Sequence, residues 1–205
     1  MAIAFACAAV VLAVLGAAVL AVIAGLVMLT QIAAMLVAPQ GRGVATILVI
    51  DVVGSTAAIS AAGDAAWDVR YGAFASAARR ELGRVPAVVV KDLGDGLLAA
   101  FPLVVSSPAK VVDAARRLQR EAAERGISLR AGIHAGECSL SRRDVRGLAV
   151  HVASRVASSA EPGQVLLSAP VRELVAGSDV ALESLGERAF KGVTDPMRVY
   201  AVATS

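Results

Sequence analysis

Residues 2–38 contain no Asp, Glu, Lys, Arg or His, although the chain has 20 Lys or Arg and 17 Asp or Glu residues, all from Arg42 onward. An apolar stretch of about 20 residues is long enough to cross a bilayer as a helix. A cleaved signal peptide fits less well, because no basic residue precedes the apolar part and this part exceeds the usual ~7–15 residues. The stretch therefore predicts one retained transmembrane helix within residues 1–38.

The distribution of charge also orients the predicted helix. No Lys or Arg precedes it, whereas Arg42 follows it closely, so the positive-inside rule places the C-terminal part in the cytoplasm. Cys7 would lie in the membrane and Cys138 in a reducing compartment, so no disulfide is expected. We expect a single-pass protein of the cell membrane with a membrane anchor, a junction and one cytoplasmic domain, at residues 1–38, 39–43 and 44–205.

Two further features bear on partners. Ala13, Ala17, Ala21 and Gly25 recur every four residues, which fits either a helix-dimerisation ridge in lipid or chance in an Ala-rich helix. The formal net charge of +3 is small, and no basic stripe is interleaved with aromatic residues. Nucleic-acid binding is therefore not expected.

Apolar strand-like runs alternate with helical patterns in residues 44–203. The sequence LGDG at residues 93–96 predicts a tight hairpin between two strands, so the sheet must be mixed. The order β-α-β-β-α-β at the start predicts a ferredoxin-like core with C-terminal additions, an α/β fold of the α+β sandwich type. Strands are expected at 45–51, 86–91, 97–101, 127–134, 164–168, 180–185 and 197–203, and helices at 57–84, 108–125, 145–160 and 170–176.

Two acidic motifs follow predicted buried strands: IDVVGST at residues 50–56 and KDLGDGLLAAF at residues 91–101. Asp51 and Asp95 would each lie at a strand end, in a loop opened by glycine. Hard cations such as Mg²⁺ prefer oxygen ligands, so two such carboxylates could hold a metal against phosphate oxygens. The pair therefore points to nucleotide chemistry.

The first acidic motif has two interpretations. Gly54, Ser55 and Thr56 lead into the expected helix, and the free amides at a helix N-terminus can receive a phosphate. Alternatively, Ser55 or Thr56 caps the helix. In the second motif, Lys91 is either a surface side chain beside a turn or a residue that faces a pocket of its own.

The segment DVRGLAVHVASR, residues 144–155, strengthens the nucleotide interpretation. Leu148, Val152 and Val156 recur every four residues and are expected to face the core. Gly147, His151 and Arg155 form a second row that a phosphate chain could approach, and Arg suits charge that develops on a transferring phosphoryl group. The alternative is that Asp144 caps the helix and that His151 and Arg155 are exposed polar residues.

Smaller signals complete the sequence evidence. Arg130 precedes a strand-like run in which His134 is expected to be a satisfied core histidine, and Lys191 lies in FKGV, a plausible strand-end loop. Trp67 and Tyr71, four residues apart, are expected to be packing residues. The absence of a GxxxxGK[ST] sequence excludes a P-loop enzyme, and no Cys/His cluster suggests zinc.

Taken in order, these motifs resemble the catalytic domain of class III nucleotidyl cyclases, and the compact bacterial type in particular. The similarity extends from about Thr46 to Val202, nearly the whole soluble part. It is carried by ILVIDVVGST, VVKDLGDGLLAAF, LRAGIHAGE, DVRGLAVHVASR, EPGQVLLS and LGERAFKGV. Each motif is weak alone, but six in this order are specific.

The resemblance implies a role for each matching residue. Asp51 and Asp95 match the two metal-binding aspartates. Lys91 and Asp144 match the pair that reads adenine, in which Lys91 donates a hydrogen bond on the N1 side and Asp144 accepts one from the 6-amino group. Arg155 matches the transition-state arginine, and Arg130 and Lys191 match basic residues that hold the triphosphate. His151 departs from the commonest pattern, which has Asn, although some bacterial relatives carry His; its charge state could add a pH dependence.

The implied reaction converts ATP to 3′,5′-cyclic AMP and pyrophosphate with two Mg²⁺ or Mn²⁺ ions per site. In the family, two subunits share each site. One supplies Asp51, Asp95 and Arg130, and the other supplies Lys91, Asp144, His151, Arg155 and Lys191. A homodimer with two equivalent sites is therefore expected.

The alternatives are a guanylyl cyclase, against which Lys91 and Asp144 argue, and a catalytically silent membrane-anchored regulatory or dimerisation domain.

Overall fold

The computed structural model describes residues 16, 19–26, 41–86, 89–141 and 144–203. The chain divides into two compact units, Met1–Ala38 and Pro39–Ser205. In the first unit, residues 19–26 are helical. None of the helices in the described ranges is long and apolar enough to span a bilayer. Most of the predicted transmembrane helix lies outside the described residues, so it stays a prediction.

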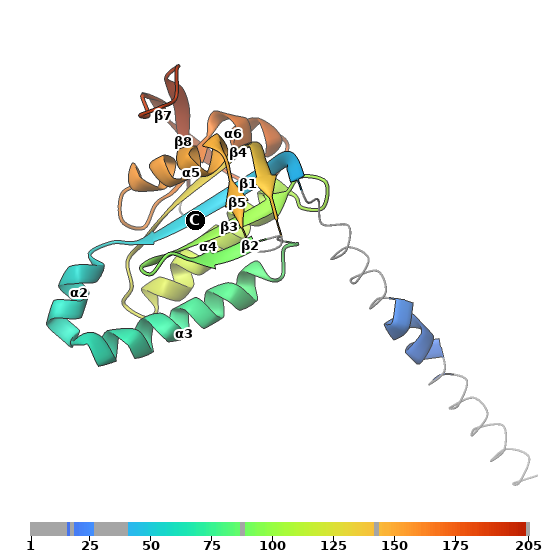
Figure 1. Cartoon of the computed structure of the whole chain (residues 1–205), viewed down its shortest axis with the longest axis horizontal. Helices are drawn as coiled ribbons and strands as arrows, with labels where there is room; N and C mark the ends of the chain where they lie inside the picture. Colours follow the sequence, from blue (N-terminus) through green and yellow to red (C-terminus); the bar gives the residue numbers. More distant parts are fainter. Residues whose placement is uncertain (1–15, 17–18, 27–40, 87–88, 142–143, 204–205) are drawn as a thin grey trace, which may run out of the picture. The chain divides into compact units, whose positions relative to one another are not determined.

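An eight-stranded sheet forms the centre of the second unit (Figure 1). Seven strands follow the order β2-β3-β1-β4-β6-β8-β7, and β5 pairs with the end of β4. Strands β4 and β6 are parallel, whereas the other pairs are antiparallel, which confirms the predicted mixed sheet. The strands are β1 (Gly41–Val52), β2 (Val89–Asp92), β3 (Gly96–Pro102), β4 (Leu129–Leu140), β5 (Val145–Arg146), β6 (Val165–Ser168), β7 (Leu182–Arg188) and β8 (Met197–Val202).

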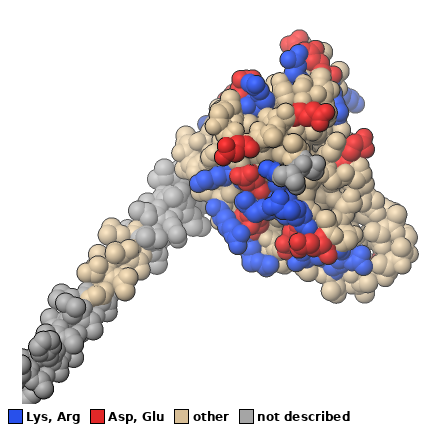
Figure 2. Space-filling view, turned by 180° about the vertical axis from the view of Figure 1, so that it is seen from behind, with Lys and Arg blue, Asp and Glu red and all other residues tan. Residues whose placement is uncertain are grey.

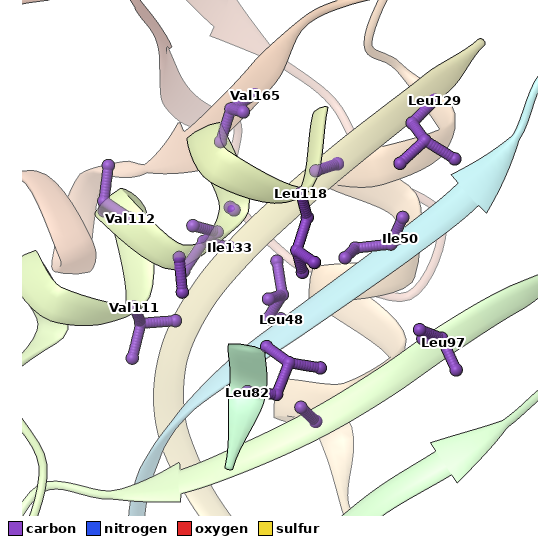
Figure 3. Close-up of a cluster of buried hydrophobic side chains, with 14 of the residues drawn as sticks. Leu48, Ile50, Leu82, Leu97, Val111, Val112, Leu118, Leu129, Ile133 and Val165 are labelled. Carbon is purple, nitrogen blue, oxygen red and sulfur yellow. The ribbon is translucent and has the colours of Figure 1, made fainter. Parts of the chain in front are cut away.

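Helices cover both faces of the sheet. They are α2 (Ser55–Ala62), α3 (Asp64–Leu82), α4 (Pro108–Ala123), α5 (Leu148–Ser158) and α6 (Ala169–Leu174). Because side chains alternate along a strand, β1 contributes to two cores. Leu48 and Ile50 pack with residues of α3, α4 and α6 in the larger core (Figure 3). Ile47 and Val49 pack against α5 on the opposite face, so the predicted sandwich is confirmed.

Two expected helices differ from those observed. The single helix expected at 57–84 is broken at Gly63, where φ is 82° and ψ is 151°. This region of backbone space is essentially restricted to glycine and cannot continue a helix. The helix expected at 145–160 begins only at Leu148, because Val145–Arg146 pair with β4 as a short strand.

The packing expectations for His134, Trp67 and Tyr71 are confirmed. The side chain of His134 is buried, and its Nδ1 lies 2.8 Å from the Ser168 hydroxyl. Burial lowers the pKa of His134 to about 4, because the charged imidazolium would lose its hydration. Trp67 and Tyr71 stack on α3 with ring centroids 6.1 Å apart.

Candidate active site

The structure places the carboxylates of Asp51 and Asp95 on neighbouring segments. Asp51 lies opposite Gly96 in the β1–β3 register, and the Val52 amide donates to the Asp95 carbonyl at 2.9 Å. Only glycine permits this approach, because a Cβ on Gly96 would lie 2.3 Å from the Ile50 carbonyl oxygen. Both acidic residues line a cavity of about 120 Å³. The expected juxtaposition of the two strand-end carboxylates is therefore observed.

Arg130 neutralises one of these carboxylates. It lies opposite Asp51 in the β1–β4 register, and its Nε and Nη2 are 2.7 Å and 2.5 Å from Asp51 Oδ2. Its Nη1 donates to the Ser158 carbonyl at the end of α5 at 3.2 Å. The guanidinium thus ties β1, β4 and α5 together beside the acidic pair.

The turn after β1 presents the N-terminus of α2 close to the same carboxylates. Gly54 is the N-cap residue with φ 70°, and no side chain caps the helix, so the capping interpretation of Ser55 and Thr56 is wrong. Instead, the Ser55 hydroxyl donates to Asp95 Oδ2 at 3.4 Å. The first amides of a helix have no partner within the helix, so those of Ser55 and Thr56 are suited to receive a phosphate oxygen.

A second group of charged residues forms around Asp144. Lys91 Nζ, on β2, lies 3.2 Å from Asp144 Oδ1, and Arg146 Nε lies 2.7 Å from Asp144 Oδ2. The Ser141 hydroxyl accepts from the Asp144 amide at 3.1 Å and donates to its carbonyl at 3.0 Å, which fixes the turn. Hydrogen bonds from Arg146 and then Lys91 lower the pKa of Asp144 and favour its ionised form.

The Asp144 group corrects one expectation and adds one residue. Asp144 does not cap α5, because Gly147 is the N-cap residue and Asp144 faces Lys91. Arg146 was not predicted to contribute. Its position two residues after Asp144 is the signal that could have found it, because alternate residues of an extended segment point to one face.

Two rows of residues were expected along α5, one facing the core and one facing a phosphate chain, and the structure buries most of the first row. Val152 and Val156 are buried as predicted, but Leu148 is 57% exposed, so its assignment to the core is wrong. Leu148 is the first residue of the helix. His151 is exposed on the other row.

Arg155 lies against the turn that carries Lys191. A Cβ on Gly192 would be in ordinary contact with Arg155 Nη1, at 3.4 Å, so the guanidinium packs closely on this turn. This Nη1 atom is buried and has no hydrogen-bond partner among the described residues. A buried guanidinium nitrogen without an acceptor is costly and is expected to receive one from a ligand or a partner. Lys191 itself is exposed between β7 and β8.

The predicted site residues therefore form three groups in one chain. Asp51 and Asp95 line the small cavity and Arg130 is paired with Asp51, Lys91 faces Asp144, and Arg155 lies beside the Lys191 turn. Within the described ranges, no three His, Cys, Asp or Glu side chains gather as a ready-made metal cluster. Two carboxylates alone still suit Mg²⁺, which is usually held by one or two carboxylates together with substrate phosphates.

Sequence comparisons identify a known family that this chain matches. The family described as "Adenylate and Guanylate cyclase catalytic domain" matches residues 37–204. A putative adenylate cyclase of Rhizobium meliloti is 31% identical over 121 residues, which cover 55% of this chain and 20% of the relative. A pH-sensitive adenylate cyclase of Mycobacterium tuberculosis is 30% identical over 129 residues, which cover 60% of this chain and 32% of the relative. The matched region thus spans less than a third of either relative.

Solved structures show the same fold. The adenylyl cyclase CyaB of P. aeruginosa superposes with a TM-score of 0.72 at 18% identity, covering 80% of this chain and 95% of that chain. The guanylate cyclase domain of RhGC from Catenaria anguillulae, solved in complex with GTP, gives a TM-score of 0.69 at 18% identity, covering 79% and 97%. Because structures with either nucleotide specificity fit this fold, the fold does not choose between ATP and GTP.

Proposed function

The chain belongs to the family of adenylate and guanylate cyclase catalytic domains, and on this premise we propose that it is a membrane-anchored adenylyl cyclase. The proposed reaction converts ATP to 3′,5′-cyclic AMP and pyrophosphate at sites shared by two copies of the chain. The observation that carries the proposal of ATP as substrate is the pair of Lys91 Nζ and Asp144 Oδ1, 3.2 Å apart.

This pair offers one donor and one acceptor side by side. Adenine presents an acceptor at N1 and a donor at its 6-amino group, so Lys91 can donate to N1 while Asp144 accepts from the amino group. Guanine in the same orientation presents N1–H and O6, so donor would face donor and acceptor would face acceptor. Unpaired groups of this kind discriminate strongly against the wrong ligand.

The acidic pair is proposed to hold the divalent cations. Asp51 and Asp95 supply the oxygen ligands that Mg²⁺ or Mn²⁺ prefers, with substrate phosphates completing the coordination. When bound, the cations lower the pKa of the attacking hydroxyl and neutralise phosphate charge. Arg130, now paired with Asp51, is then able to exchange this carboxylate for the triphosphate.

The remaining residues act on the nucleotide. The 3′-oxygen of ATP attacks the α-phosphorus, the bond from this phosphorus to the bridging oxygen breaks, pyrophosphate leaves, and the hydroxyl proton is released. Arg155 stabilises the charge that develops on the α-phosphate, which gives its buried Nη1 an acceptor. Lys191 and the amides at Gly54, Ser55 and Thr56 hold phosphate oxygens, and His151 donates near the ribose.

A direct assay tests the proposal. The purified full chain is incubated with ATP or GTP in the presence of Mg²⁺ or Mn²⁺, and the cyclic product is measured by chromatography. We expect cyclic AMP from ATP, little product from GTP, and a loss of at least about 100-fold for Asp51→Asn. Asp68→Asn, on an exposed position of α3, serves as the matched control and is expected to retain activity.

Each alternative function has its own outcome in this assay. Product from GTP but not ATP would show a guanylyl cyclase. No product from either nucleotide, at a concentration where the dimer is demonstrated, would instead favour a silent regulatory domain.

A further inference from the structure

We propose that a groove between α3 and α4 binds a small phosphate-bearing anion, at a site separate from the proposed active site. The groove has a volume of about 310 Å³, and its lining includes Arg80 of α3, Arg84 just after this helix, and Arg117 and Arg120 of α4. We call it the arginine groove. On the face that Figure 2 shows, basic side chains lie close together with acidic ones among them.

Two of the four arginines are held in place by one carboxylate. Glu81, whose side chain is only 12% exposed, accepts from Arg117 Nε at 2.5 Å and from Arg84 Nη1 at 2.6 Å. Each guanidinium has five N–H donors, so these bonds orient the two arginines and leave most of their donors for a ligand. Such prior orientation reduces the entropy that a bound anion would otherwise cost.

Within the part of the chain that the structure describes, the side chains of Arg80 and Arg120 make no hydrogen bond or ion pair. Phosphate oxygens match the guanidinium fork with two parallel hydrogen bonds, so phosphate is the ligand class that these donors favour. The volume exceeds that of a single phosphate, which favours a diphosphate.

The charge balance of the groove is positive. Three glutamates also line it, but Glu81 is shared by two arginines and Glu121 is paired with Arg125 at 2.8 Å. Only Glu124 is left to oppose a bound anion. Arginines therefore exceed glutamates by two when Arg125 is counted with the four that line the groove.

Calorimetric titration of the full chain with inorganic pyrophosphate tests this proposal. Chelator is present, so that divalent cations cannot bridge the anion to Asp51 and Asp95. We expect saturable binding that weakens at least about tenfold in the double variant Arg80→Ala/Arg120→Ala, which loses several charge-assisted hydrogen bonds. Since neither side chain makes a hydrogen bond or ion pair within the described ranges, the variant should keep the wild-type circular dichroism and melting temperature. Arg80→Lys/Arg120→Lys keeps the positive charge but loses the planar guanidinium that can give a phosphate two parallel hydrogen bonds. This variant is expected to bind pyrophosphate with intermediate affinity.

Two controls locate the anion. Arg155→Ala/Lys191→Ala removes cations of the proposed active site and should leave the pyrophosphate binding of the arginine groove unchanged. Inorganic phosphate, with one group instead of two, should bind more weakly than pyrophosphate. The proposal is overturned if wild-type protein shows no saturable binding at millimolar pyrophosphate, or if the active-site variant loses binding while the groove variant keeps it. Neither result depends on cyclase activity, so failure here leaves the proposed function separately testable.

Discussion

At the scale of single residues, Arg146 is the residue that changes how the nucleobase pocket is expected to work. Its Nε lies 2.7 Å from Asp144, and its hydrogen bond is the largest contribution to the lowered pKa of that carboxyl. In Arg146→Ala the pKa of Asp144 should rise towards its ordinary value. Because Asp144 must be ionised to accept from the 6-amino group, the acidic limb of the kcat/KM profile for ATP should move to higher pH.

Measurement of kcat/KM at acidic pH, around and below the ordinary carboxyl pKa of 3.8, checks this expectation. Arg146→Lys should restore part of the wild-type profile. Arg42→Ala, which removes an arginine whose side chain is 81% exposed and pairs with Glu137, should leave it unchanged. An acidic limb that coincides with that of wild type would show that Arg146 does not set the protonation of Asp144.

His134 is expected to dominate a different pH effect, on stability. Burial lowers its folded pKa from 6.5 to about 4, so the unfolded chain takes up the proton first as the pH falls. Stability contributed by the neutral imidazole is complete above pH 6.5 and is lost progressively towards pH 4. Between pH 7.5 and pH 5 the unfolding free energy of wild type should fall by about 2 kcal/mol more than that of His134→Asn. Urea unfolding at the two pH values measures this difference. The control is His151→Asn, at the other histidine, whose unfolding free energy should fall as much as that of wild type.

At the scale of elements, local patterns predicted the existence of most helices and strands but not their ends. Apolar runs were enough to place β1, β3 and β6, and a helical pattern was enough to place α4. The break at Gly63 was missed because an apolar helical pattern continues across it, and only the backbone geometry of that glycine separates α2 from α3. The late start of α5 was missed because Val145–Arg146 become a strand only through pairing with distant residues of β4.

One contact between elements decides where α5 lies. A Cβ on Gly132 of β4 would lie 2.1 Å from the Ala157 nitrogen, so Gly132→Ala must displace the helix that carries His151 and Arg155. We expect destabilisation of about 3 kcal/mol and a loss of cyclase activity. Gly72→Ala, on α3 with nothing within 4 Å of the added carbon, should instead stabilise by about 0.5–1 kcal/mol. Thermal unfolding and activity of the two variants measure both effects, and equal stability of the two would contradict the close packing of α5 on β4.

At the scale of the whole molecule, the motifs predicted which residues matter, whereas the structure shows which of them meet. Lys91 and Asp144 are 53 positions apart, and the sequence alone gives no reason for their contact. The resemblance to the cyclase family supplied that pairing. Arg130 was expected to face a triphosphate, yet in this structure it neutralises Asp51, which no local pattern indicates.

The site residues form three separate groups in one chain. The decisive prediction is therefore that each complete site is assembled from two subunits of a dimer. If one subunit supplies Asp51 and the other supplies Arg155, Asp51→Ala and Arg155→Ala homodimers should both be inactive. A heterodimer of the two variants has one site with both lesions and one site with neither. With equal and random pairing, half of the dimers are heterodimers with one intact site of two, so the mixture should regain about a quarter of wild-type activity.

Co-expression of the two variants with different tags, followed by a cyclase assay of the mixed population, measures this recovery. A mixture of Asp51→Ala and Asp95→Ala provides the matched control. Both lesions belong to the same half-site, so every site of that heterodimer is damaged and no activity should return. If the two variants of the first mixture are shown to fold and pair, and activity still does not return, Asp51 and Arg155 do not act in one site from different subunits. Activity in the matched control would reject the assignment of Asp51 and Asp95 to the same half-site.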